Sequence, residues 1–462
     1  MQFQTILRKP SYDRGITSEF SITKDRSPDV ISLIAKERTM KRKSMKLAAM
    51  ITASMIILST VGCATTQDAS VQSEETGTED STETGTENTQ DSTAAEVVAT
   101  STSVVSEEDG SALRVSELFS ERDLEQEADL TNAETLTLKS GEDITITEEG
   151  VYVVSGQVEN STIYVEASED AKIQIVLDKV SITNESMPAI YIKSGDKVFI
   201  TTTDSENTLK VTGSYVADGD TNLDAVIFSK SDITVNGVGA LDITSDTGNG
   251  ITSKDDLIIT GGSIEITAAG DGLEANDAIC IYDGILTINA GKDAIHSENE
   301  ENTSTGHFYM RSGTLNLTAG DDGIQANAIN QVDGGIITIT SATEGIEGTY
   351  VQINGGEITI NASDDGINAT SKSEYDVLLE VNGGTISVVM GAGDTDAFDS
   401  NGTIVINGGT ITIEGMSAFD SDGTATLNGG DVTVNGEKIT EITQMQMGGG
   451  RGGNGGFIKR GF

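Results

Sequence analysis

The chain has 462 residues, with 74 acidic against 28 basic side chains and a net charge of −46. A field of this sign repels nucleic acid and anionic membranes and attracts cations, which excludes a protein that binds phosphate backbones. With 52 Gly, 3 Pro and no Trp, the composition is not that of an average globular domain, and 2 Cys exclude a disulfide-stapled scaffold.

The N-terminal part has the pattern of an export signal. Residues 40–62 combine a basic stretch with an apolar run that ends at Gly62, immediately before Cys63. This order is typical of a bacterial lipoprotein signal peptide, and it predicts lipidation at Cys63 and a protein exported to the cell surface. A retained membrane helix is the alternative, although the run is short for a span. Residues 1–39 suggest a start site assigned too early.

Two further segments lack a core-forming pattern. Residues 63–110 are rich in Ser, Thr, Glu, Asp and Gly, which predicts a disordered linker extended by its own charge. Residues 441–462 form a Gly-rich tail, also expected to be disordered. The tail resembles a Gly-Asp calcium repeat but lacks the Asp, so no metal is assigned there.

Residues 111–440 contain a repeat of about 22 residues. An acidic residue, a small residue and an aliphatic residue recur together, as in Asp271-Gly-Leu273, and a Gly pair such as Gly355-Gly356 lies midway between recurrences. Apolar residues alternate with polar ones on both sides of the Gly pairs, which indicates strands with one buried face. Three short strands per repeat, with glycine at the turns, predict an all-β right-handed parallel β-helix.

Coils of such a solenoid stack about 4.8 Å apart and share one core. The column from Leu273 through Ile346 to Phe419 is predicted to lie in that core, and residues 144–212 are expected to form the early coils. An antiparallel sandwich would not place equivalent residues in register at this interval. Residues 112–128 have helical spacing, and we expect a cap over the open end within residues 111–142.

Stacking also places carboxylates above one another, which is unfavourable unless a cation lies between them. Oxygen ligands from adjacent coils suit Ca²⁺, whose coordination geometry is tolerant. A solvated acidic face is the alternative. Zinc and iron are disfavoured because the repeat region holds few His and Cys. The candidate calcium ligands, from the columns and two acidic loops, are Asp218, Asp220, Asn222, Asp224, Asp271, Glu274, Asp293, Asp321, Asp322, Glu344, Glu347, Asp364, Asp365, Asp394, Asp396 and Asp399.

The outward face of the middle strand of each coil is a second candidate site. It carries aromatic and amide side chains, and two insertions, residues 297–307 and 370–377, leave the same corner of the coil and could wall a groove. Aromatic rings stack on sugars while amides and carboxylates bind hydroxyls, although an ordinary polar surface would look similar. The predicted sugar-binding residues are Tyr282, Tyr309, Arg311, Tyr350, Gln352, Lys372 and Tyr375.

Several stretches of the repeat region resemble a family of bacterial surface lipoproteins known as carbohydrate-binding-domain-containing proteins. The stretches are FSERDLEQEADL (119–130), VSITNESMPAIYIKSGDKVFITTTDSENTL (180–209), VADGDTNLDAVIFSKSDI (216–233), GITSKDDLIITGG (250–262), GTYVQINGGEITINASDDGINA (348–369) and VVMGAGDTDAFDSNG (388–402). The resemblance implies a right-handed parallel β-helix that binds cellulose and pectin-like acidic polysaccharide. It also implies calcium sites similar to those of calcium-dependent pectate lyases.

The sequence therefore favours a calcium-loaded, cell-surface protein that binds polysaccharide as a monomer and touches the membrane only through its lipid. The alternative is a lyase in which Ca²⁺ neutralises a uronate and a Lys removes a proton. The candidate bases are Lys230, Lys254, Lys292 and Lys372. An adhesin or wall protein that binds no sugar is a third class.

Overall fold

The structure, a computed structural model, describes residues 111–392 and 395–443. The predictions made for the export signal, for Cys63, for the linker and for most of the Gly-rich tail lie outside these residues. Within them, no helix is both long and apolar enough to cross a membrane.

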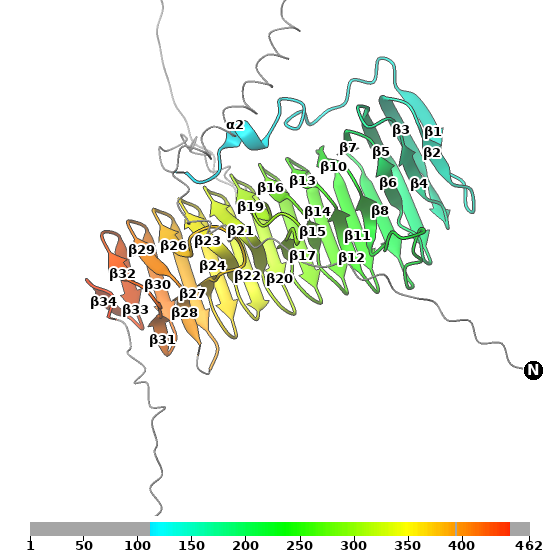
Figure 1. Ribbon diagram of the computed structural model, residues 1–462. Helices are drawn as coiled ribbons and strands as arrows, with labels where there is room; N and C mark the ends of the chain where they lie inside the picture. Colours follow the sequence, from blue (N-terminus) through cyan, green and yellow to red (C-terminus); the bar gives the residue numbers. More distant parts are fainter. Residues whose placement is uncertain (1–110, 393–394, 444–462) are drawn as a thin grey trace, which may run out of the picture. The chain divides into compact units, whose positions relative to one another are not determined.

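The described residues form a parallel β-solenoid of about 12 turns, as the repeat predicts. Each strand pairs with its equivalents in the previous and the next coil, so that three sheets run along the solenoid (Figure 1). β21 and β23 are long enough to bend from the first sheet into the second, and β3 and β5 likewise belong to the second and third sheets.

The first sheet contains β2 (Ile144–Ile146), β4 (Ile163–Glu166), β6 (Ile190–Ser194), β9 (Ala225–Ser229), β12 (Asn249–Ser253), β15 (Leu273–Ala275), β18 (Ile295–Ser297), β21 (Ile324–Val332), β23 (Ile346–Ile353), β25 (Ile367–Ala369), β28 (Asp396–Ser400) and β31 (Ser417–Phe419). The second contains β1 (Glu134–Thr137), β3 (Gly150–Glu159), β5 (Lys172–Asn184), β7 (Lys197–Thr202), β10 (Asp232–Gly237), β13 (Asp256–Ile259), β16 (Ala278–Ile281), β19 (His307–Met310), β26 (Leu378–Val381), β29 (Thr403–Ile406) and β32 (Ala425–Leu427). The third contains β8 (Glu206–Val211), β11 (Ala240–Ser245), β14 (Ser263–Ala268), β17 (Ile285–Ala290), β20 (Thr314–Thr318), β22 (Ile336–Ala342), β24 (Glu357–Ala362), β27 (Thr385–Met390), β30 (Thr410–Glu414), β33 (Asp431–Val434) and β34 (Glu437–Ile439).

The predicted core column is confirmed. Leu273, Ile295, Ile324, Ile346, Ile367, Phe398 and Phe419 lie opposite one another in register and are all buried. Because every coil offers its aliphatic side chains to the coils above and below, one continuous core runs through the solenoid.

Glycine and asparagine form the corner between the second and third sheets. The second glycine of each pair has positive φ, for example 94° at Gly356 and 90° at Gly384, a conformation that other residues rarely adopt. Beside these glycines, the side-chain amide of Asn382 donates to Asn354, that of Asn407 to Asn382 and that of Asn428 to Asn407, at 2.8 to 2.9 Å. This ladder of amides ties the corners of successive coils together.

At the C-terminal end, a hairpin covers the edge of the third sheet. A turn at Asn435 and Gly436, both with positive φ, reverses the chain so that β34 pairs antiparallel with β33. β33–β34 is the one antiparallel strand pair among the described strands.

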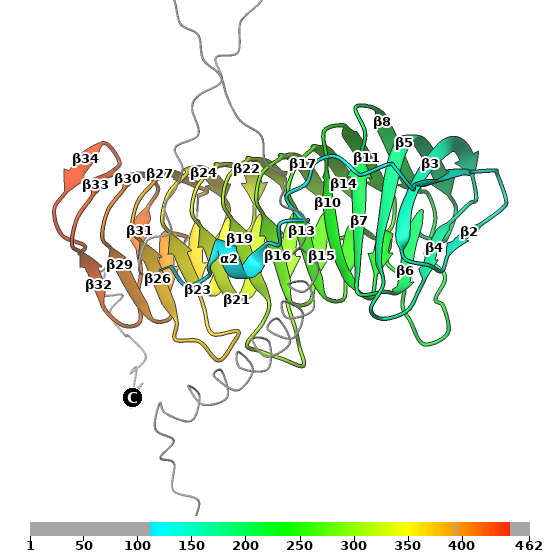
Figure 2. The same ribbon diagram turned by 90° about the horizontal axis from the view of Figure 1, so that it is seen from above.

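The helix expected within residues 112–128 is almost absent, and this segment packs on the side of the solenoid instead of covering the open N-terminal end. The helix α2 spans only Val115–Leu118, and residues 112–126, which we call the strap, lie along the outside of the second sheet (Figure 2). Leu113, Val115, Leu118 and Phe119 pack on a buried patch that includes Cys280 and Tyr309. Their helical spacing reflects this side-on contact.

The strap is anchored by a buried acid. Asp123 is 1 % exposed, pairs with Lys197 at 2.7 Å and accepts a hydrogen bond from Thr234 at 2.5 Å. At the other end of the strap, the amide of Gln331 accepts from the Leu113 N–H at 2.6 Å and donates to the Leu113 carbonyl at 3.0 Å.

Replacing Asp123 by Ala should detach the strap, because the ion pair that holds it to Lys197 would be lost. The ammonium of Lys197, whose side chain is only 12 % exposed, would then be left without its partner. Removing one member of such a pair typically costs about 3–5 kcal/mol. We expect lower stability in denaturant unfolding and faster labelling of Cys280 by a thiol reagent, measured in a Cys63→Ser background. The exposed Asp129→Ala serves as the control, and a Cys280 that stays unreactive below the unfolding transition would argue against the anchor.

Candidate functional site

One polar column runs along the outside of the first sheet. Its members alternate with core residues and lie in register from coil to coil, as the sequence predicts. They are Thr252, Glu274, His296, Gln325, Glu347, Asn368 and Asp399.

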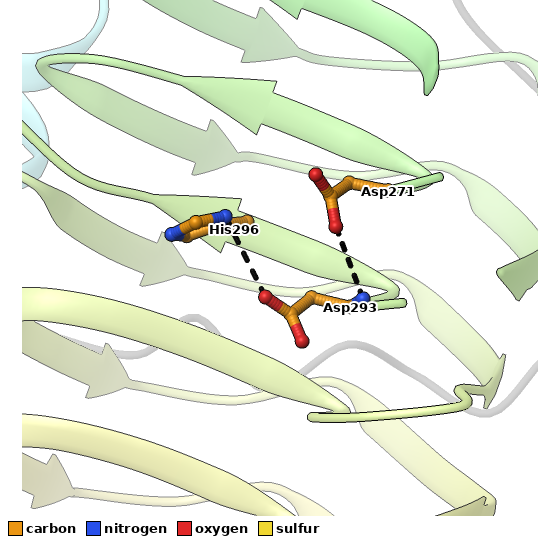
Figure 3. A group of neighbouring side chains, drawn as sticks. All are labelled: Asp271, Asp293 and His296. Carbon is orange, nitrogen blue, oxygen red and sulfur yellow. Dashed lines mark hydrogen bonds and ion pairs between the residues drawn. The ribbon is translucent and has the colours of Figure 1, made fainter. Parts of the chain in front are cut away.

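A second, acidic column precedes the same strands. Asp271, Asp293 and Asp322 are buried, with 4 to 6 % of each residue exposed. One oxygen of Asp271 accepts the backbone N–H of Asp293 at 3.1 Å (Figure 3). One oxygen of Asp293 accepts the backbone N–H of Asp322 at 2.8 Å. The column therefore has a structural role in joining the coils, and each of these carboxylates keeps its second oxygen for other contacts.

Among the described residues, acidic side chains on and beside the two columns, together with one imidazole, gather in four groups whose ligand atoms lie within 4.8 Å of one another. These groups are Asp271–Asp293–His296, Asp293–Asp321–Asp322, Asp322–Glu344–Glu347 and Asp396–Asp399–Asp420. Figure 3 shows the first of them, in which the imidazole of His296 lies 3.5 Å from Asp293. His296 and Asp420 belong to these groups but were not among the ligands predicted from the sequence.

Burial, together with the crowding of carboxylates, raises the pKa values of several grouped acids. Burial, followed by the neighbouring Asp293 and Glu344, raises the pKa of Asp322 to about 8. Burial and Glu347 raise the pKa of Glu344 to about 7, and burial and Asp365 raise that of Asp399 to about 7. Without a cation, several of these groups therefore hold protons close to neutral pH, and a bound cation would favour their release.

Of two predicted calcium ligands on the outward column, one lies in an acidic group and the other does not. Glu347 lies in a group, whereas Glu274 accepts hydrogen bonds from Asn249 and Thr252 and pairs with Lys254 at 2.8 Å. Asp364 and Asp365 likewise fall outside the four groups. Asp394 lies outside the described residues.

The predicted calcium loop from Asp218 to Asp224, with Asp220 and Asn222, does not form a shared site. Asp218 pairs with the backbone of Thr221 in a tight turn, and its carboxylate lies 3.2 Å from the ammonium of Lys193. Asp224 instead faces Glu274, and burial together with that carboxylate raises its pKa to about 6. The spacing resembled a calcium loop, but the turn and Lys193 separate its acids.

The predicted sugar-binding face is wrong for two of its central members, because the strap covers it. Tyr309 and Gln352 are fully buried, and the oxygen of Gln352 accepts the N–H of Ala112 at 2.9 Å. Tyr282 and Arg311 are partly buried beside the strap, with the Tyr282 ring 5.2 Å from Phe119. Alternation predicts which way a side chain points, but not whether another segment lies over it.

Tyr350 is partly buried and donates to Glu380 at 2.7 Å. The two insertions contact each other directly. Tyr375 of one donates to the carbonyl of Ser304 in the other at 3.3 Å, and its ring lies 6.1 Å from that of His307.

Two adjoining pockets open on the first sheet, beside the insertion at residues 297–307. One of about 600 Å³ is lined by Lys254, Asp277 and Glu298, and one of about 740 Å³ by Asp224, Asp271 and Lys292. Glu274 and His296 line both pockets, so the part of the two columns from Asp271 to His296 borders both of them.

Of the four candidate bases, Lys230 donates to the hydroxyl of Thr221 at 2.7 Å. Lys254 pairs with Glu274 and Lys372 with Glu347, whereas Lys292 is 67 % exposed at 3.9 Å from Asp271. The first sheet thus presents carboxylates in register with a few lysines among them.

Comparison with known proteins identifies the class. A model of the carbohydrate-binding domain-containing protein family matches residues 140–397 and 350–441. A curated relative with the same description, from Acetivibrio thermocellus, is 40 % identical over 200 residues, which cover 42 % of this chain and 70 % of the relative. The chain belongs to the carbohydrate-binding domain-containing protein family.

Among solved structures, the chain is similar to a gadolinium derivative of a polysaccharide lyase-like protein from C. thermocellum. The sequences are 23 % identical, the match covers 65 % of this chain and 94 % of the other, and the TM-score is 0.33.

The raised pKa values predict an unusual dependence of stability on pH in the presence of a chelator. The folded pKa of Asp322, about 8, exceeds its ordinary value of 3.8, so the folded state binds more protons than the unfolded state between these values. Stability should therefore fall as pH rises from about 4 to about 8. We expect the melting temperature at pH 8 to lie below that at pH 5 by roughly 2 °C or more, about 1 kcal/mol in a large domain.

Asp322→Asn is the matched variant for this measurement, because it removes the titrating group while keeping a side chain of the same shape. It should flatten the profile. A melting temperature that rises over this range in the wild-type protein would contradict the expected crowding.

Proposed function

We propose that this protein binds polysaccharide along the first sheet and that calcium ions held by the acidic columns take part. Membership of the carbohydrate-binding family supports the class of ligand. The main support for this location is the set of four acidic groups on one face, of which the two that contain Asp293 adjoin a pocket large enough for sugar units.

The residues present fit calcium. Three of the four groups offer only carboxylate oxygens, the donor type that calcium prefers, while Asp271–Asp293–His296 includes an imidazole and is the least suited. Two buried oxygens that lack a hydrogen-bond partner, one on Asn368 and one on Asp224, lie beside the acidic columns. Asp293, Asp321, Asp322, Glu344 and Glu347 would hold ions at the centre of the face, and Asp396, Asp399 and Asp420 at its C-terminal part.

The charge of the protein bears on the kind of polysaccharide. With a net charge of −46, the chain repels an anionic polymer such as polygalacturonate unless exposed cations bridge protein carboxylate and uronate. A neutral glucan such as cellulose needs no such bridge. None of the contacts made by the described lysines points to a base that removes a proton from a sugar. We therefore propose that the protein binds polysaccharide without cleaving it.

Chelation tests the bridge. Removing calcium with EDTA should abolish binding to polygalacturonate, because the carboxylates of both partners would then repel, while any binding to cellulose should persist. Pull-down or calorimetry with each polymer measures this, and added calcium should restore the first interaction. Equal binding to polygalacturonate with and without chelator would reject the bridge.

We also propose that the protein is an exported lipoprotein held at the cell surface through Cys63. The order of basic stretch, apolar run and cysteine supports this. Cys63→Ser should abolish incorporation of a labelled fatty acid and release the protein from the membrane fraction. The variant Cys280→Ser, which leaves the signal unchanged, should retain the label. Membrane retention of an unlabelled Cys63→Ser protein would instead indicate an uncleaved anchor.

A further inference from the structure

One acidic group differs from the others in the lysine that contacts it. The ammonium of Lys372 pairs with Glu347, a member of the Asp322–Glu344–Glu347 group whose side chain is only 6 % exposed. Among the described residues, Lys292 is the other lysine paired with a grouped carboxylate; its side chain is 67 % exposed and lies 3.9 Å from Asp271. The ammonium of Lys372 therefore partly balances the charge of a group in which two of the three acids are buried.

The backbone of Lys372 is held independently of its side chain. The N–H groups of Lys372 and Ser373 donate to the hydroxyl of Thr349 at 2.9 and 3.0 Å, and Thr349 is fully buried. The lysine side chain is 27 % exposed, so its flexible stem has a route into solvent. The ammonium could leave Glu347 by rotation of the side chain, while the insertion stays in place.

A second buried side chain supports a ligand at this position. Asn368 is 7 % exposed, its amide nitrogen donates to Glu344 at 3.0 Å, and its amide oxygen lacks a hydrogen-bond partner. Rotation of this amide by half a turn would direct the oxygen at the same carboxylates. That orientation is unfavourable beside bare acids and favourable beside a divalent cation.

We propose that Lys372 is an internal counter-ion that competes with a divalent cation for the Asp322–Glu344–Glu347 group. Binding of the ion turns the ammonium out toward solvent, where it can pair with a carboxylate of the bound polysaccharide. The inference rests on the proposed function and adds a residue that couples ion binding to recognition of an acidic sugar.

Calcium titration of the full chain by calorimetry tests the competition. In Lys372→Met, the calcium affinity of one class of site should rise by about fivefold or more. Fivefold is roughly the lower end of the range in which two competing ligands usually affect each other's affinity. Lys372→Arg keeps the charge and should behave as the wild type, and Lys292→Met should tighten calcium binding far less. Lys372→Gln, which retains a donor for Glu347, should show the same tightening and covers the case in which the Met variant does not fold.

Binding of polygalacturonate at saturating calcium tests the second part of the proposal, in which the freed ammonium pairs with the polymer. Lys372→Met and Lys372→Gln should bind the polymer more weakly than the wild type although they bind calcium more tightly. Calcium affinities equal to that of the wild type in both variants would overturn the competition while leaving calcium binding itself established. If neither the wild type nor any variant bound calcium, the proposed function would be refuted. If the Lys372 variants bound the polymer as tightly as the wild type, the freed ammonium would have no role in polymer binding.

Discussion

The stacking of equivalent residues in register is the constraint on which the rest of this structure depends. A parallel pairing that repeats at every coil brings each side chain against its own counterpart, about 4.8 Å away. Aliphatic columns gain a continuous core from this arrangement, and asparagine columns gain a ladder of amides. Acidic columns are destabilised by the same arrangement, because it brings like charges together.

The acidic columns meet this repulsion in three ways. One oxygen of Asp271 and of Asp293 is used in a bond to the backbone of the next coil. Protons are retained on groups such as Asp322, whose pKa is raised to about 8, mainly by burial. At Glu347 a lysine from an insertion supplies the counter-charge. The same surface can thus exist with protons, with lysine or, as we propose, with calcium.

The sequence was sufficient for those features that the repeat determines. Its period predicted the solenoid, the buried column from Leu273 to Phe419 and the glycine turns, because each depends on local alternation repeated in register. It was not sufficient for contacts between segments far apart in the chain. The strap packs on β16 and β19 more than 150 residues away, so the outward direction of Tyr309 was predicted correctly and its exposure wrongly. The acids of the 218–224 loop were separated by a turn and by Lys193, neither of which spacing alone reveals.

The hairpin at the C-terminal end has a consequence for assembly. A parallel solenoid offers at its last coil the same backbone edge that it uses internally, and a second molecule could continue the stack there into a fibre. β34 covers part of that edge with a strand of opposite direction, which the next coil of another chain could not match. Continuation of the third sheet into a second molecule is thereby hindered at this terminus.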